Sequence, residues 1–403
     1  MNQTRKEARF VYNCKYSKKC GGCSLLNLEY EEQLSLKQAR LIRLLGRYCR
    51  VDEIIGMENP LYYRNKVQSA FCHRNGTVVS GVYQSSTRRI VPIDSCLLED
   101  KKAAEIIKTL KKLAVSFKLM PYDIIKGRGF LRHALVRRGF KSGEIMVVIV
   151  TAKGAFPSKD AFVSELIRLH PEITSVVWNV NNTETPLFLG EKETVLFGNG
   201  YIIDSLCGLD FRISAKSFYQ VNPVQAERLY NIAKEYAAVS KGETVIDAYC
   251  GTGTIGLTVA NEARSLIGIE VNADAVRDAR VNAEQNGIKN ARFIAADAGE
   301  VMKELAQKGE KIDVVITDPP RAGCSKRFLE SLSSLSPERI VYVSCNPETL
   351  SRDLYFLKKN GYKVKKIQPV DMFPFTDHVE CVVSLTRNNT DRTCALKHQT
   401  KGK

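Results

Sequence analysis

The residue with the clearest potential for covalent chemistry is Cys345. It lies in Ser-Cys-Asn-Pro, residues 344–347, at the end of the β-branched run 339–345. A cysteine between a strand and a helix lies near backbone N–H groups, which can lower the pKa of its thiol. A thiolate there could act as a nucleophile, whereas most cysteines in strands are small buried hydrophobes. The motif and its place at a strand end favour the nucleophile.

Upstream of Cys345, acidic residues and glycines recur where apolar runs end. The segment Asp247–Gly256, Asp-Ala-Tyr-Cys-Gly-Thr-Gly-Thr-Ile-Gly, separates a strand from a helix. Glycines there let the backbone approach a ligand, and Glu270 after the next strand could accept hydrogen bonds from ribose hydroxyls. Asp297 and Asp318 follow the third and fourth runs. A glycine loop alone could also bind a dinucleotide, and helix capping is the alternative role of the carboxylates.

Ligands of an open α/β sheet bind at the carboxyl ends of its strands, where these residues would gather beside Cys345. The arrangement resembles the Rossmann-like methyltransferases that bind S-adenosylmethionine. The predicted cofactor-binding residues in this part of the chain are Asp247, Gly251, Gly253, Glu270, Asp297 and Asp318.

Glu380 is the predicted general base. In this class of methyltransferase the last strand runs antiparallel beside the fifth, so Glu380 at the start of run 380–386 would lie near Cys345. A thiolate that adds to C6 of uracil makes C5 nucleophilic towards a sulfonium methyl group, and the C5 proton must then leave to a base. His378 is a second candidate base or a local structural residue.

Two sequence patterns along the chain predict the secondary-structure elements that position these residues. From about residue 241, short β-branched runs alternate with helical stretches, which indicates an α/β fold. We expect a Rossmann-like class I methyltransferase domain with a seven-stranded sheet whose last strand is antiparallel. Upstream, residues 62–92, 129–151 and 173–203 are predicted as strands, with a turn at Asn75-Gly76. Helices are predicted at 26–47 and 99–119.

The expected domain boundaries follow from these two sequence patterns. Residues 12–25 and 58–215 would form a mostly β domain, 26–57 a helical segment packed on the catalytic domain, and 216–388 the methyltransferase domain. The segment 389–403 reads as a disordered basic tail.

The amino-acid composition indicates which class of binding partner to expect. The 403-residue chain carries a net charge of +16, which favours a polyanionic partner such as RNA over a merely solvated basic surface. It has no apolar run long enough for a membrane span and no secretory signal at its start. We therefore expect a cytoplasmic protein, acting as a monomer.

Three cysteines near the start, Cys14, Cys20 and Cys23, share one short segment with two glycines, and Cys96 is the candidate fourth ligand. Four thiolates suit a [4Fe-4S] cluster or a structural zinc. The absence of a second Cys-x2-Cys pair favours iron–sulfur. The spacing differs from the Cys-x3-Cys-x2-Cys of radical S-adenosylmethionine enzymes.

Together, these motifs resemble the RNA uracil-5-methyltransferases of the ribosomal 23S type, over about residues 14–386. The resemblance also rests on Phe-Tyr-Gln-Val-Asn at 218–222, Asp-Pro-Pro-Arg at 318–321 and His-Val-Glu at 378–380. It implies an rRNA (uracil-5-)-methyltransferase with a [4Fe-4S] cluster on the four cysteines, acting on 23S rRNA. Gln220 would contact the cofactor or the base, Phe218 would stack on the flipped uracil, and Asp318 would bind a polar edge of the base.

One departure from the family concerns its N-terminal TRAM β-barrel, for which the segment before Cys14 leaves no room. RNA contacts would then come from the central domain, with candidates Arg64, Lys66, Arg132, Arg137 and Arg138. The alternatives are a transfer-RNA substrate, a non-catalytic RNA-binding or ribosome-assembly factor, and an amino-group methyltransferase that uses Asp318-Pro-Pro.

Overall fold

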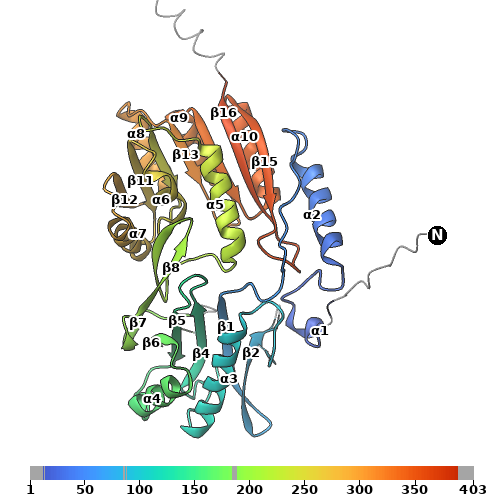
Figure 1. Cartoon of the computed structure of the whole chain (residues 1–403), viewed down its shortest axis with the longest axis vertical. Helices are drawn as coiled ribbons and strands as arrows, with labels where there is room; N and C mark the ends of the chain where they lie inside the picture. Colours follow the sequence, from blue (N-terminus) through green and yellow to red (C-terminus); the bar gives the residue numbers. More distant parts are fainter. Residues whose placement is uncertain (1–11, 13, 85–86, 88, 184–187, 389–403) are drawn as a thin grey trace, which may run out of the picture. The chain divides into compact units, whose positions relative to one another are not determined.

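A computed structural model describes residues 12, 14–84, 87, 89–183 and 188–388, and the chain forms two compact units (Figure 1). The first unit contains Met1–Gln33, Glu58–Val224 and Phe373–Asp377. The second contains Leu34–Met57, Gln225–Met372 and His378–Lys403. The tail predicted at 389–403 lies outside the described residues.

A seven-stranded sheet forms the centre of the first unit, in the order β3-β2-β1-β4-β5-β6-β7. The turn between β1 and β2 places both Asn75 and Gly76 at positive φ (49° and 79°), as a tight hairpin requires. A separate hairpin, β8-β9, follows. The strands are β1 (Lys66–Arg74), β2 (Thr77–Tyr83), β3 (Ile90–Pro92), β4 (Leu131–Arg138), β5 (Ile145–Thr151), β6 (Ile173–Val180), β7 (Lys192–Gly198), β8 (Tyr201–Leu206) and β9 (Leu209–Ser214).

Two helices, α3 (Lys101–Ser116) and α4 (Lys159–Leu169), pack on this sheet and complete its apolar core. The sequence did not predict α4, although Phe162, Val163 and Leu166 bury one face of it. Its presence explains why β5 and β6 pair in parallel, because parallel neighbours need a crossover connection. A short helix, α1 (Ser17–Cys20), lies in the cysteine-containing segment.

The second unit is built on the predicted α/β sheet, in the order β12-β11-β10-β13-β14-β16-β15. The strands from β12 to β14 are parallel, whereas β16 pairs antiparallel with both β14 and β15, which confirms the predicted fold class. These strands are β10 (Thr244–Ala248), β11 (Ser265–Glu270), β12 (Ala291–Ala295), β13 (Val314–Thr317), β14 (Arg339–Ser344), β15 (Tyr362–Val370) and β16 (Glu380–Arg387).

Helices between these strands bury their apolar faces in one large core around the sheet. They are α5 (Pro223–Ala237), α6 (Thr254–Ala260), α7 (Ala273–Gln285), α8 (Ala298–Gln307), α9 (Lys326–Leu335) and α10 (Pro347–Lys359). Because each parallel strand ends where its helix begins, the loops that carry the predicted site residues meet at one edge of the sheet.

The helix α2 (Tyr30–Leu45) contributes Leu41 and Leu45 to this core although it lies far away in sequence. After α2, Val51 and Ile55 form parallel bridges to β15, so the early segment lies beside the late strand (Figure 1). A buried ion pair, Lys37 Nζ to Asp371 Oδ1 at 2.6 Å, adds a polar link between them.

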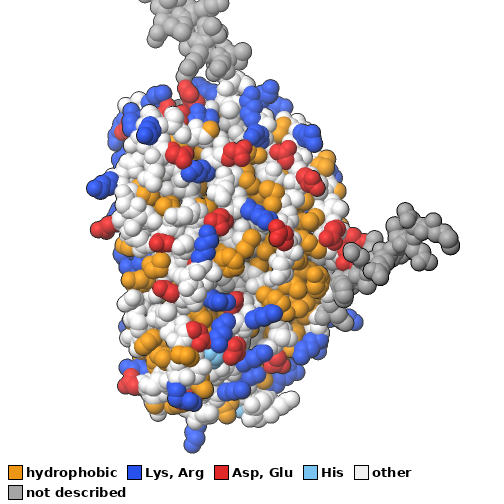
Figure 2. All heavy atoms as spheres, in the orientation of Figure 1, with side chains coloured by type: hydrophobic (Ala, Val, Ile, Leu, Met, Phe, Trp, Pro, Cys, Tyr) orange, Lys and Arg blue, Asp and Glu red, His pale blue; other side chains and the backbone are white. Residues whose placement is uncertain are grey.

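Basic and acidic side chains are intermingled over the face of the molecule seen in Figure 2, so the net charge of +16 does not form one continuous patch there. Among the described residues, the structure has no helix with the length and apolar character needed to cross a bilayer.

Candidate active site

The register between β14 and β16 brings the predicted nucleophile and base together. Ser344 pairs with Cys381, which places Cys345 and Glu380 one position further along the two antiparallel strands. Cys345 is half-buried at the start of the turn into α10, and Glu380 is only 4% exposed. Strand pairing therefore brings into one site two residues that lie 35 positions apart in the sequence.

The Cys345 thiol is held in its protonated form in this arrangement. Burial raises its pKa to about 11, the Glu380 and Asp318 carboxylates add to the rise, and the Arg321 guanidinium and a backbone hydrogen bond oppose it. The sequence-based expectation of a lowered pKa is wrong here, since desolvation and two neighbouring carboxylates outweigh the backbone N–H groups.

Asp318 and Glu380 form a pair of interacting buried carboxyls. Burial raises the pKa of Asp318 to about 7, and burial together with the Asp318 charge raises the pKa of Glu380 well above its ordinary value. Two carboxylates that share a desolvated site cannot easily both ionise, so the pair retains a proton near neutral pH. Such a pair can accept or release a proton where catalysis needs one.

Arg321 is the site residue to which the sequence analysis gave no role. Its guanidinium lies 2.9 Å from His378 Nε2, and its charge lowers the pKa of both Cys345 and Glu380. The Asn346 side chain donates to the Arg321 carbonyl at 3.0 Å and caps α10, so the Ser-Cys-Asn-Pro motif also fixes the loop after β13. The signal was available in the sequence, because Arg321 directly follows Asp-Pro-Pro. His378 is thus a partner of Arg321.

The glycine-rich loop after β10 has the conformation that its sequence predicts. Gly251 and Gly253 adopt positive φ (54° and 84°), and the Gly251 amide donates to Glu270 Oε2 at 3.2 Å. The other Glu270 oxygen accepts from the Asn272 amide at 2.9 Å. Glu270 therefore organises the loop from the carboxyl end of β11, the edge at which open α/β sheets bind ligands.

Asp247 is buried beneath the loop and accepts from the Gly256 amide at 2.8 Å. A Cβ at position 256 would lie 2.6 Å from Asp247 Oδ2, so only glycine allows this approach. Burial raises the pKa of Asp247 to about 7, against the lowering effect of the Gly256 amide. Asp297 caps α8 by accepting from the Glu300 amide at 3.1 Å, which is the capping role considered from sequence.

Phe218 and Gln220 belong to the first unit, in the segment between β9 and α5. Phe218 is 66% exposed and Gln220 is 7% exposed. A large aromatic ring left in solvent has lost hydrophobic burial, so a packing role is excluded for Phe218 in this structure.

Residues 29–388 match the family model described as tRNA (Uracil-5-)-methyltransferase. The chain belongs to this family. It is 44% identical over 373 residues to an uncharacterized RNA methyltransferase of Oceanobacillus iheyensis (91% of this chain, 81% of that protein). It is 42% identical over 381 residues to another of Clostridium acetobutylicum (93% of this chain, 83% of that protein).

The crystal structure of a Pyrococcus abyssi tRNA (uracil-54, C5)-methyltransferase in complex with S-adenosyl-L-homocysteine is also similar. It is 32% identical, has a TM-score of 0.76, and the match covers 91% of this chain and 86% of that chain. The predicted resemblance to RNA uracil-5-methyltransferases is therefore confirmed, as is the fold of S-adenosylmethionine-dependent methyltransferases.

In this uracil-5-methyltransferase family member, the four predicted cluster cysteines lie in one neighbourhood of the first unit. Burial raises the pKa of the Cys23 thiol to about 12, and the nearby thiols of Cys96, Cys20 and Cys14 add to this rise. The Asp94 amide donates to Tyr16 Oη at 3.1 Å, which joins the two cysteine-bearing segments. All four thiols are free of disulfides, a donor set that fits iron–sulfur or zinc. In the described ranges, however, no three His, Cys, Asp or Glu side chains are arranged as a metal site, so the cluster stays a prediction.

Proposed function

We propose that the protein transfers the methyl group of S-adenosylmethionine to C5 of a uridine in 23S ribosomal RNA, through a covalent bond between Cys345 and C6. The observation that carries the proposal is the β14–β16 register, which sets Cys345 beside Glu380. An amino-group methyltransferase would need neither residue, and a non-catalytic RNA-binding protein would have no use for their juxtaposition.

In the proposed reaction, the Cys345 thiol first loses its proton to solvent, and the resulting thiolate adds to C6 while the electron pair of the C5–C6 double bond moves towards O4 as an enolate. S-adenosylmethionine supplies an electrophilic methyl group; C5 attacks it, the methyl–sulfur bond breaks, and S-adenosylhomocysteine leaves with the electron pair. Glu380 then removes the C5 proton, the C5–C6 double bond re-forms, and the C6–S bond breaks to regenerate the thiolate. Arg321 favours the charged forms of Cys345 and Glu380 in these steps.

The remaining predicted site residues would bind the reactants. Asp247, Gly251, Gly253, Glu270 and Asp297 would hold the cofactor along the carboxyl edge of β10 to β12, with Gln220 as a further cofactor contact. Asp318 would contact the cofactor or a polar edge of the base, and the exposed ring of Phe218 would stack on the extruded uracil, which offsets part of the stacking lost in the RNA.

The choice of 23S rRNA rests on the cysteine-containing segment, which resembles that of the ribosomal enzymes. Transfer RNA is the second candidate, favoured by the description of the matched family and by the substrate named for the Pyrococcus abyssi protein. We further propose that the protein acts in the cytoplasm as a monomer.

The test is a map of modified uridines in RNA from a strain that lacks the protein. We expect 5-methyluridine to disappear from the 23S rRNA and to return when the purified protein and S-adenosylmethionine are added. Loss from tRNA alone would select the second candidate. An N-methylated product, or RNA binding without methyl transfer to any RNA, would contradict the proposal.

We also propose that Cys14, Cys20, Cys23 and Cys96 hold a [4Fe-4S] cluster that clamps the N-terminal segment to the strand domain. Anaerobically purified protein should then contain iron and sulfide and absorb broadly in the visible range. Cys96→Ser should lose the iron and lower the Tm by roughly 5–10 °C, because a structural metal contributes to folding free energy. Cys72→Ser, at a half-buried cysteine of β1 outside the set, should change neither. A colourless protein that contains zinc would refute the assignment.

A further inference from the structure

Two cations of the first unit, Lys66 and Arg137, face each other across neighbouring strands. They are direct partners in the antiparallel pairing of β1 with β4, which puts both side chains on the same face of the sheet. Like charges in this position repel and destabilise the sheet. Neither side chain forms an ion pair with a carboxylate of the described residues.

Burial makes this arrangement more costly still. Arg137 is 2% exposed, and of its three guanidinium nitrogens only Nη2 has a partner, the Ser217 carbonyl at 3.0 Å. Burial lowers the pKa of Arg137 to about 10, and burial together with the charges of Arg137 and Arg64 lowers that of Lys66 to about 8. Unpaired buried charges destabilise the folded state. Within the part of the chain that the structure describes, no carboxylate neutralises this positive site.

The other basic candidates of this domain are occupied within the protein. Arg132 donates to the carbonyls of Asn181 and Thr183, and Arg138 pairs with Asp100 at 3.1 Å. The guanidinium groups of Arg132 and Arg138 are therefore engaged within the protein, whereas Arg137 uses only Nη2 and no carboxylate of the described residues pairs with Lys66 or Arg137.

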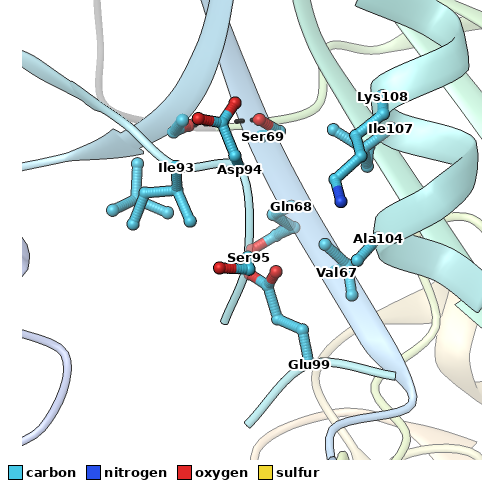
Figure 3. A pocket seen from close by; sticks show the side chains of 12 residues that line it. Val67, Gln68, Ser69, Ile93, Asp94, Ser95, Glu99, Ala104, Ile107 and Lys108 are labelled. Carbon is cyan, nitrogen blue, oxygen red and sulfur yellow. Dashed lines mark hydrogen bonds between the residues drawn. The ribbon is translucent and has the colours of Figure 1, made fainter. Parts of the chain in front are cut away.

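Glu99 interacts electrostatically with Arg64, whose charge in turn lowers the pKa of Lys66. Glu99 lines a small cavity of about 20 Å³ beside β1 and α3, and its side chain extends towards Ser95 (Figure 3). Burial raises its pKa to about 7, against the opposite effect of Arg64, so it is only partly ionised near neutral pH. Arg64 also lowers the pKa of the Cys20 and Cys23 thiols. The charges that shift the pKa of Lys66, by contrast, are those of Arg137 and Arg64, with no thiol or carboxylate among them.

The cationic pair is joined to the segment that carries Phe218. Arg137 holds the Ser217 carbonyl, and the Asn65 amide, next to Lys66, donates to the Val221 carbonyl at 2.9 Å. The exposed Phe218 ring thus stands on a segment fixed at both ends to the strands that bear the cations.

We propose that Lys66 and Arg137, with Arg64 beside them, form a binding site for a phosphodiester of the RNA backbone close to the nucleotide that stacks on Phe218. The inference rests on the proposed function for the identity of that nucleotide. Lys66, which is partly exposed, contacts the phosphate as a point charge, and the buried Arg137 contributes its field and fixes Ser217. The incoming negative charge relieves the repulsion across β1 and β4.

The test measures binding of a fluorescent single-stranded oligouridine to the full-length protein over a range of salt concentrations, without S-adenosylmethionine. Lys66→Gln should weaken binding by about 3- to 30-fold and reduce the slope of log Kobs against log salt by about 0.7, the value for one phosphate contact on a single strand. Arg74→Gln, at the exposed far end of the same strand, should change neither. Lys66→Arg should restore the slope, which a purely structural role would not explain.

A second probe removes the charge from the RNA. On an oligouridine with neutral methylphosphonate linkages, wild type and Lys66→Gln should bind equally. An unchanged salt slope in Lys66→Gln would overturn the proposal, as would displacement of the oligouridine by an equal concentration of inorganic phosphate, which would indicate a site for free phosphate. Because no methyl transfer is measured, this result stands or falls separately from the Cys345 chemistry.

Discussion

Cys345→Ala is expected to abolish methylation while leaving the binding of S-adenosylmethionine intact. The substitution removes the only atom in the proposed mechanism that can add to C6, and without that addition C5 does not become nucleophilic. Loss of a covalent nucleophile typically lowers kcat by about 10⁴-fold or more. The cofactor loop belongs to β10 and β11, which do not pair with β14, so cofactor affinity should change little. Methyl transfer to RNA and calorimetric titration with S-adenosylmethionine measure the two effects.

A substrate analogue that traps the covalent intermediate tests the same role of Cys345. RNA that carries 5-fluorouridine should form a stable covalent adduct with the wild-type protein, because fluorine cannot leave C5 as a proton does. Cys345→Ala should form none, whereas Cys49→Ala, at another half-buried cysteine of the second unit, should behave as wild type. Normal turnover of Cys345→Ala on the target RNA would rule out the covalent mechanism.

Glu380→Gln is expected to stop the reaction after methyl transfer and to accumulate the methylated adduct. The amide cannot accept the C5 proton, so the C5–C6 double bond does not re-form and the C6–S bond persists. Removal of a general base typically costs about 10²- to 10⁴-fold in rate. Denaturing gel electrophoresis of protein with RNA and radiolabelled S-adenosylmethionine should show a labelled complex of higher mass. Glu338→Gln, at the opposite end of β14, is the matched control.

The pH dependence follows from the direction of the pKa shifts. The pKa values of Asp318 and Glu380 are both raised, that of Asp318 to about 7, so both carboxyls are protonated in acid and activity should rise as the pH increases out of the acid range. The raised Cys345 pKa, about 11, extends the rise into the alkaline range because the thiolate fraction keeps growing. Glu380→Gln removes a charge that opposes the thiolate, so Cys345 should react faster with iodoacetamide at a given pH. An unchanged alkylation profile would mean that Glu380 does not act on Cys345.

The sequence by itself determined the residue types and the elements that carry them. The alternation of β-branched runs with helical stretches specified the α/β fold because strand and helix periodicities differ, and Asn75-Gly76 specified its hairpin through its tolerance of positive φ. Helix α4 was missed, since a short amphipathic segment between two buried strands carries a weak periodic signal.

The tertiary structure alone decided how the charges act on one another. Register placed Cys345 beside Glu380, but the sign of the thiol pKa shift depended on how much water the fold excludes and on which carboxylates it brings near. The same holds for Lys66 and Arg137, two ordinary basic residues in sequence that strand pairing places opposite each other, with Arg137 buried and Lys66 half-buried. Covalent order fixes which groups are present, whereas desolvation and Coulomb energy depend on distance and burial, which only the folded chain supplies.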